Sequence, residues 1–239
     1  MKMIVWTRSE DDWEMDKRLF TGIEDRVIHL PCIESKKIAY EIPLKSFNIF
    51  VFTSARAVRF AAEDSVLAKK MVSAEKIYTF CQKTYEALCA LSLGTSRPDN
   101  VKSGLELAEF LSCNLKPTDS VMVVGAVKAS FDIAGHLLTH GYNCFYLAIY
   151  ETVPICAISG QRMEFLKGGN SIIICFASPS AVDGFIVLTS GQIALREDNI
   201  SAVAIGDTTK SECERYFARV HKSEESTVRS LAEKALTLM

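Results

Sequence analysis

The sequence predicts an α/β fold with two lobes, each a parallel β-sheet joined by crossover helices, one lobe being inserted in the other. Three observations lead to this prediction. A strand-to-helix pattern occurs twice at a constant offset, and β-rich and helical patterns alternate along the chain. One part of the repeat stands at a different place in each copy. With 239 residues, the chain has room for two domains of ordinary size.

The repeat is clearest where a strand runs into a helix. The segments "VFTSARAVRF" (51–60) and "CFASPSAVDGF" (175–185) both place a serine at the bend after an apolar run. Four residues match at an offset of 124: Phe52 with Phe176, Ser54 with Ser178, Ala57 with Ala181, and Val58 with Val182.

Two further landmarks keep nearly the same offset. The segment "IYTFCQKTYEAL" (77–88) matches "AVAIGDTTKSEC" (202–213), and "LELAEFL" (105–111) matches "VRSLAEKAL" (228–236). Within the first pair Thr84 faces Thr209 at an offset of 125. Three landmarks in the same order indicate a duplicated fold unit.

The remaining segments give the topology. The chain opens as strand, helix, strand ("MKMIVWTRSEDD…DRVIHLP"), whereas the comparable piece of the other copy comes late, at 121–154. One lobe is therefore expected to be discontinuous, from 1–34 and 153–239, with the other inserted at 35–152. The crossings near "LPCIESKK" and "YETVPI" are expected to pair as a two-segment β linker. Such a connection permits hinge motion around a cleft between two flavodoxin-like lobes.

Several helix starts carry capping patterns. Ser178-Pro179 is an N-cap followed by proline at the first helical position. Four pairs fit a capping box: Ser9 with Asp12, Ser103 with Glu106, Ser180 with Asp183, and Thr209 with Glu212.

Composition excludes several classes of function. A net charge of −2 creates no field that would gather nucleic acid or an anionic membrane. The eight cysteines are widely spaced and several sit in apolar runs, which is typical of buried thiols in a reducing compartment and excludes a zinc site with paired CxxC ligands. The opening segment turns polar too early for a signal peptide, and no apolar run approaches a membrane span. We expect a cytoplasmic protein, acting as a monomer.

Hydroxyl side chains follow the strands in both copies. In open α/β sheets, ligands bind beyond the carboxyl ends of the strands. Ser54, Thr84, Ser178 and Thr209 stand there, where free N–H groups of a helix start favour an anion. A ligand site and ordinary helix capping both remain open for these residues.

Taken together, the inserted topology, "VFTSARAV", "CFASPSAV", "AIGDTT", the LAE helices and "YETVP" resemble the uroporphyrinogen-III synthase family over essentially the whole chain. The resemblance implies a cofactor-free lyase of tetrapyrrole and heme biosynthesis. Its substrate would be hydroxymethylbilane, which loses water, inverts ring D through a spiro intermediate and closes to uroporphyrinogen III.

The resemblance also implies roles for particular residues. Tyr150 matches the tyrosine considered to be the acid near the departing hydroxyl, and an aromatic residue that only packs is the alternative. The residues expected to bind substrate are Ser54, Arg56, Thr84, Ser178, Ser180, Thr208 and Thr209. The chain departs from the family pattern at Cys81, where glycine is usual, and at Lys128, near which relatives often place an arginine.

Other functional classes lack their signatures. The chain has no GxGxxG, no GxxxxGK and no GxSxG, which disfavours nucleotide binding and a serine hydrolase. Acidic residues in "TRSEDDW" stand where a flavin phosphate would sit. His136 and His140 have metal-ligand spacing without further ligands, so no metal is expected. The rival hypothesis is a non-catalytic two-lobed protein that binds a small anion.

Overall fold

A computed structural model describes residues 2–239, and its contacts divide the chain into two compact units. Unit 1 comprises residues 1–34 and 152–239, and unit 2 comprises residues 35–151. These limits differ from the expected ones by one residue, at the second crossing.

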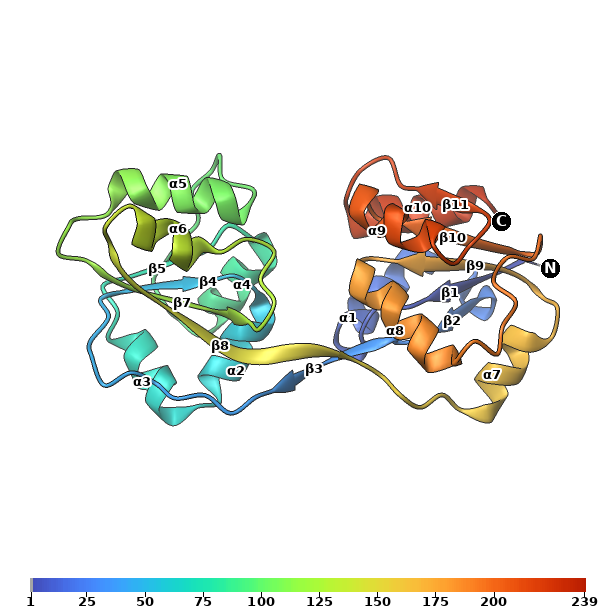
Figure 1. Ribbon diagram of the computed structural model, residues 1–239, viewed down its shortest axis with the longest axis horizontal. Coiled ribbons are helices and arrows are strands. Elements are labelled where there is room, and N and C mark those ends of the chain that lie inside the picture. Colours follow the sequence, from blue (N-terminus) through green and yellow to red (C-terminus); the bar gives the residue numbers. More distant parts are fainter. Residues whose placement is uncertain (1) are drawn as a thin grey trace. The chain divides into compact units, whose positions relative to one another are not determined.

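Unit 2 is a parallel sheet with helices on both faces (Figure 1). Its strands are β4 (Ile49–Phe52), β5 (Lys76–Tyr78), β6 (Thr95–Ser96), β7 (Ser120–Ala126) and β8 (Asn143–Pro154), the last of which runs on into unit 1. Its helices are α2 (Ala55–Ala62), α3 (Ser65–Val72), α4 (Gln82–Ala90), α5 (Gly104–Asn114) and α6 (Ile133–Thr139).

The sheet of unit 2 has the order β8-β7-β4-β5-β6, with β3 (Ile33–Lys37) beside β8. Its strands are short apolar runs, such as the fully buried "IFVF" of β4, as expected for a sheet covered on both faces. Helices α2, α3 and α4 pack against one face, around Phe50 and Phe52. Helices α5 and α6 pack against the other, around Val51 and Val123.

Unit 1 repeats this arrangement. Its strands are β1 (Lys2–Trp6), β2 (Val27–His29), β9 (Ser171–Phe176), β10 (Ile200–Ala204) and β11 (Val220–Lys222). Its α-helices are α1 (Glu10–Asp16), α7 (Gly160–Lys167), α8 (Pro179–Thr189), α9 (Asp207–Glu214) and α10 (Val228–Thr237). Two short 3₁₀ helices, η1 (Lys17–Phe20) and η2 (Glu24–Arg26), lie between α1 and β2.

The two sheets have the same strand order, which explains the repeat. The order β2-β1-β9-β10-β11 of unit 1 corresponds strand by strand to β8-β7-β4-β5-β6 of unit 2. Helices α2 and α8 begin at Ala55 and Pro179, and α5 and α10 begin at Gly104 and Val228, so both pairs keep the offset of 124. The predicted α/β class with parallel sheets is confirmed.

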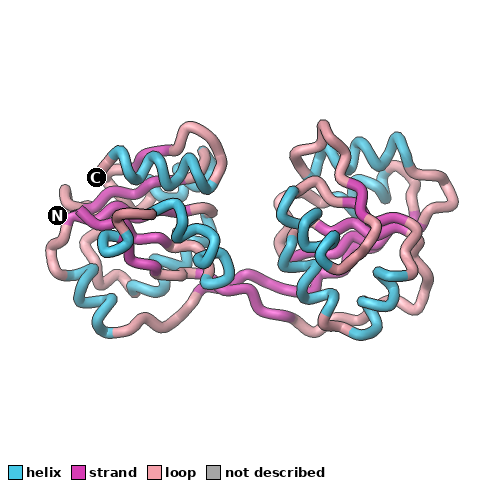
Figure 2. The backbone as a smooth tube through the Cα atoms, turned by 180° about the vertical axis from the view of Figure 1, so that it is seen from behind, coloured by secondary structure: helices cyan, strands magenta, loops and turns pink. Residues whose placement is uncertain are grey.

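The chain crosses between the units in β3 and in the end of β8, which are neighbours in one sheet (Figure 2). Ile155 N donates to Cys32 O at one end, and Ile38 N donates to Ile149 O at the other. Because residue numbers rise along one strand as they fall along the other, these two bonds indicate antiparallel pairing.

Three of the predicted helix starts are correct in position, and two are wrong. Ser9 is the N-cap of α1, but its hydroxyl donates to the Asp12 carboxylate and makes no cap bond. Ser178 and Ser103 are the N-caps of α8 and α5, and each accepts a hydrogen bond from the backbone three residues on. The capping boxes predicted at Ser180 and Thr209 do not form, because α8 is capped by Ser178 and α9 by Gly206. Both residues lie inside the first turn instead.

Among the helices of residues 2–239, none is long and apolar enough to span a bilayer. Within the same residues no group of three or more His, Cys, Asp or Glu side chains is placed to hold a metal ion. His136 and His140 are stacked on each other near the end of α6, with ring centroids 4.4 Å apart.

Candidate active site

Unit 2 has a topological switch point between β4 and β7. From β4 the chain proceeds outward through β5 and β6, and it then returns to the other side of β4 to form β7 and β8. Loops leave the carboxyl ends of β4 and β7 in opposite directions at such a point, and the opening between them is where α/β sheets bind ligands.

A cavity of about 230 Å³ lies at this switch point. It is lined by Thr53 and Ser54 after β4, by Lys128, Ser130 and Phe131 after β7, and by Tyr150 of β8. Hydroxyl groups, one ammonium group and aromatic faces therefore meet in one opening. Its volume is below the roughly 300–1,000 Å³ of ligand pockets, so it suits only a part of a large substrate.

Ser54 has two roles in the structure. Its backbone is extended, and its Oγ accepts a hydrogen bond of 3.1 Å from Ala57 N, which caps α2. The same Oγ lies 2.9 Å from the Tyr150 hydroxyl. Because the bond from Ala57 uses only a lone pair, the Ser54 hydroxyl hydrogen can still be donated to the tyrosine oxygen.

Tyr150 is held in place by hydrophobic packing and by a hydrogen bond. The residue is only 6% exposed and belongs to the hydrophobic core between the sheet and α2. The ring of Phe60 packs at 5.7 Å from its own ring, while its hydroxyl reaches Ser54 and the cavity. Tyr150 is therefore a packed aromatic residue whose hydroxyl also reaches the cavity, and its role as an acid stays a prediction.

The corresponding edge of unit 1 carries Ser178, Ser180 and Thr208. Ser178 follows β9 and caps α8, accepting a 3.2 Å bond from Ala181 N, and its Oγ lies 3.0 Å from the Ser180 Oγ. Ser180 and Thr208 are exposed at the starts of α8 and α9. The structure therefore brings two of the predicted substrate-binding hydroxyls of this unit together.

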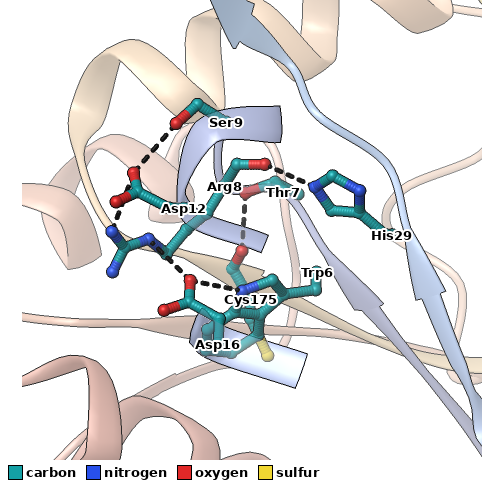
Figure 3. A network of polar contacts seen from close by, with 8 residues as sticks. All are labelled: Trp6, Thr7, Arg8, Ser9, Asp12, Asp16, His29 and Cys175. Atoms are coloured by element: carbon teal, nitrogen blue, oxygen red, sulfur yellow. Dashed lines mark hydrogen bonds and ion pairs between the residues drawn. The ribbon is translucent and has the colours of Figure 1, made fainter. Parts of the chain in front are cut away.

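A network of polar contacts lies beside the switch point of unit 1, between β1 and β9 (Figure 3). The Arg8 guanidinium pairs with Asp12 at 2.9 Å and with Asp16 at 3.1 Å. Asp16 also accepts from the Trp6 indole, and the Thr7 hydroxyl crosses to the carbonyl of Cys175.

His29 completes this network. Its Nε2 lies 2.9 Å from the Arg8 carbonyl, and its ring stacks on Trp13 at 4.6 Å. Burial lowers the pKa of His29. The network holds one arginine against two carboxylates, with Glu10 and Asp11 beside it in the first turn of α1. This edge therefore disfavours an anion at α1, as expected from "TRSEDDW".

Three predicted substrate-binding residues are placed differently from Ser54. Thr84 is fully buried, and its hydroxyl has no hydrogen-bond partner among the described residues. Thr209 is also buried, at 3% exposure. Arg56 is half-buried in the first turn of α2. None of the three lines the cavity beside Tyr150, and their role in binding stays a prediction.

The two departures from the family pattern also have a structural context. Cys81 is the N-cap of α4 with φ −97°, an extended backbone that any residue adopts, so no glycine is needed there. Lys128 lines the cavity. Thr53, Ser130 and Phe131 were not predicted, although Thr53 directly follows β4 and the other two lie in the loop between β7 and α6.

Solved structures define the class of this fold. A uroporphyrinogen-III synthetase from Helicobacter pylori superposes with a TM-score of 0.74, at 20% identity and 100% coverage of both chains. A mutant uroporphyrinogen III synthase from the extremely thermophilic bacterium Thermus thermophilus gives a TM-score of 0.54, at 17% identity, over 99% of this chain and 100% of that one. At these identities the likeness concerns the fold.

Sequence comparison gives the family. The family described as "Uroporphyrinogen-III synthase HemD" matches residues 21–233, so the chain belongs to the uroporphyrinogen-III synthase family. A curated relative, "Porphyrin biosynthesis protein HemD" of Ruminiclostridium josui, is 24% identical over 221 residues. That match covers 88% of this chain and 43% of the relative, so the chain spans less than half of the relative's length.

Proposed function

We propose that this chain is an active uroporphyrinogen-III synthase, which converts hydroxymethylbilane to uroporphyrinogen III with loss of water. The observation that carries the proposal is the pair of hydroxyls of Ser54 and Tyr150, 2.9 Å apart, at a polar cavity on the ligand edge of a sheet. Family membership supplies the reaction, and this pair supplies a proton donor.

Binding rests on many weak donors. The linear substrate carries acetate and propionate arms, and a 230 Å³ cavity takes one arm or part of one ring. Lys128 offers a single positive charge, and Thr53 and Ser130 offer hydroxyls. Ser178, Ser180 and Thr208 offer hydroxyls at the edge of the other sheet. A substrate held in this way keeps its shape while one ring turns.

In the proposed chemistry, Tyr150 is the general acid of the first step. The C–O bond of the hydroxymethyl group breaks as the pyrrole nitrogen pushes electrons toward it, and the departing oxygen takes the Tyr150 proton and leaves as water. The Ser54 hydroxyl then donates to the phenolate. Ring D is then inverted through the spiro intermediate before the macrocycle closes. Closure releases a proton when the attacked pyrrole regains aromaticity, and this proton restores the tyrosine.

The proposal has further parts. The reaction needs no metal and no organic cofactor, because acid catalysis and held geometry supply the rate. The protein acts as a cytoplasmic monomer in porphyrin and heme biosynthesis. Its substrate is the small tetrapyrrole precursor, without a nucleic acid or membrane partner.

The test is the isomer that forms. Hydroxymethylbilane closes spontaneously to the type I isomer, so activity appears as diversion to type III, separated by chromatography after oxidation to the porphyrin. Purified protein without added metal should give type III. Tyr150→Phe should slow this by about 10²–10⁴-fold, the usual cost of a lost general acid. Tyr142→Phe, which removes a hydroxyl that donates to Ser112 O, is the matched control and should not.

Type I product at the uncatalysed rate with wild-type protein that still binds substrate would overturn the proposal in favour of an anion-binding protein. Equal rates in Tyr150→Phe and wild type would remove Tyr150 from the mechanism and leave the family reaction in place.

A further inference from the structure

The side chain of Tyr150 lies on the face of the sheet opposite to the one that strand alternation assigns to it. In β8, Leu147 and Ile149 pack in the core beneath α2, and Cys144 and Tyr146 pack in the core beneath α5 and α6. Because side chains alternate along a strand, Tyr150 should follow Tyr146. It packs with Ile149 instead, in the core beneath α2.

A β-bulge causes this change of face. Gly125 of β7 is opposite Ala148 of β8, but the next residue, Ala126, is opposite Tyr150. Ile149 is therefore the extra residue in β8, and bulges of this kind re-aim the side chains that follow them. In a regular pairing Ala126 would oppose Ile149, and the Tyr150 hydroxyl would point away from Ser54.

Two hydrogen bonds stabilise the bulge. The Tyr146 hydroxyl donates to the carbonyl of Ala126 at 2.5 Å, and Val127 N donates to the carbonyl of Tyr150 at 2.8 Å. Burial raises the pKa of Tyr146 to about 12, so its hydroxyl stays protonated and remains a donor at neutral pH.

Gly125 makes room for this arrangement. A Cβ at this position would lie 2.6 Å from the Tyr146 hydroxyl oxygen and 2.6 Å from the Thr53 Oγ1. Real Cβ atoms do not approach so closely, so a side chain here forces both hydroxyls to shift, and the one that moves from Tyr146 is the donor to Ala126. The glycine and the tyrosine therefore act on the same hydrogen bond.

We propose that Tyr146 and Gly125 are positioning residues, which maintain the bulge in β8 and thereby aim the Tyr150 hydroxyl at Ser54 and the cavity. The catalytic meaning of this inference rests on the proposed function, and the geometric claim does not. The two are tested by separate measurements.

The geometric test follows Tyr150 itself by NMR. In protein labelled with ¹³Cζ-tyrosine, the Tyr150 signal is assigned by its loss in Tyr150→Phe. Ser54→Ala gives the shift that accompanies loss of the 2.9 Å bond. Tyr146→Phe and Gly125→Ala should each move the Tyr150 signal in the same direction. Tyr142→Phe, the matched loss of a tyrosine hydroxyl bonded to a backbone carbonyl, should leave it unmoved.

An unmoved Tyr150 signal in Tyr146→Phe would overturn the proposal, as would an equal movement in Tyr142→Phe. If Gly125→Ala fails to fold, Tyr146→Phe decides alone, because it adds no atom to the core. This test needs no turnover, so it stands even if wild-type protein makes no type III isomer.

The kinetic test compares the effect of Tyr146→Phe in wild-type protein and in the Tyr150→Phe variant. Tyr146→Phe should lower kcat for type III formation by up to about 10²-fold, the cost of a misplaced catalytic group, with a smaller change in KM. In the Tyr150→Phe background the same substitution should cost nothing further, because the group that it positions is gone. Equal losses in both backgrounds would show that Tyr146 acts independently of Tyr150 and would overturn the proposal.

Discussion

The free energy of the hydrogen bond between Ser54 and Tyr150 can be measured. Ser54 also caps α2, and the repeat supplies a control for that role, because Ser178 caps α8 in the same way. Ser54→Ala removes a helix cap, worth about 0.5–2 kcal/mol, and a hydrogen bond, worth about 0.5–1.5 kcal/mol. We therefore expect a loss of about 1–3.5 kcal/mol in the free energy of unfolding. Ser178→Ala removes the matching cap and an exposed contact with the Ser180 hydroxyl, and should cost little more than the cap.

A double-mutant cycle with Tyr150→Phe separates the two contributions. The cap is lost in Ser54→Ala whether residue 150 is tyrosine or phenylalanine, so it cancels, and the coupling energy reports the hydrogen bond. The cavity beside both hydroxyls admits water. Water can therefore satisfy the partner that remains, which places the expected coupling at the lower end, about 0.5–1 kcal/mol.

Urea unfolding of the full chain is the assay, and the aromatic residues help to separate the units. Both tryptophans, Trp6 and Trp13, lie in unit 1, so tryptophan fluorescence follows that unit, whereas far-UV circular dichroism follows both. Ser54→Ala should shift the dichroism transition more than the fluorescence transition, and Ser178→Ala should shift the fluorescence transition. A coupling energy within about 0.3 kcal/mol of zero, the error with which independent substitutions add, would refute the assignment of the hydrogen bond.

Three further predictions concern packing and charge. Gly184→Ala should destabilise unit 1 by about 1–2 kcal/mol, because its Cβ would lie 2.3 Å from the carbonyl oxygen of Cys32; Gly160→Ala, with no atom near its Cβ, should be neutral or stabilising in the same urea assay. Burial lowers the pKa of His29 below its usual 6.5 in the folded protein. As the pH falls, this histidine is therefore protonated in the unfolded chain at a higher pH than in the folded one. Stability should therefore fall as the pH drops below about 6.5, and His29→Gln should reduce that slope. Thr84→Val should raise stability by about 1 kcal/mol, because the buried hydroxyl has no partner; a large loss of type III formation would instead support its predicted role in binding.

Much of the fold could be predicted from the sequence because the relevant signals are local. Apolar runs such as "IFVF" and "IIICF" specify strands buried on both faces. A serine after each run stops the strand and caps the next helix, at Ser54 and at Ser178. Because duplication preserved these local signals at a constant offset, the order of elements in both units was readable without any contact information.

The exact helix boundaries could not be predicted from these local signals alone. A four-residue capping pattern states which residues suit a helix start, but the end of the preceding strand decides where the start falls. Strand β10 ends at Ala204 and the chain turns at Gly206, so α9 begins before Thr209 is reached. Thr209, the predicted N-cap, is instead a buried residue in the first turn of α9.

The sequence by itself determined the parallel α/β architecture, the repeat and the presence of hydroxyl residues at the strand ends. Only the tertiary structure decided which of those hydroxyls meet. The side of the sheet on which Tyr150 lies depends on a bulge, and the bulge depends on Gly125, Tyr146 and Ala126 coming together from two neighbouring strands. Regular alternation predicts the wrong face, because the register of one strand against another is set by packing between residues that are distant in sequence.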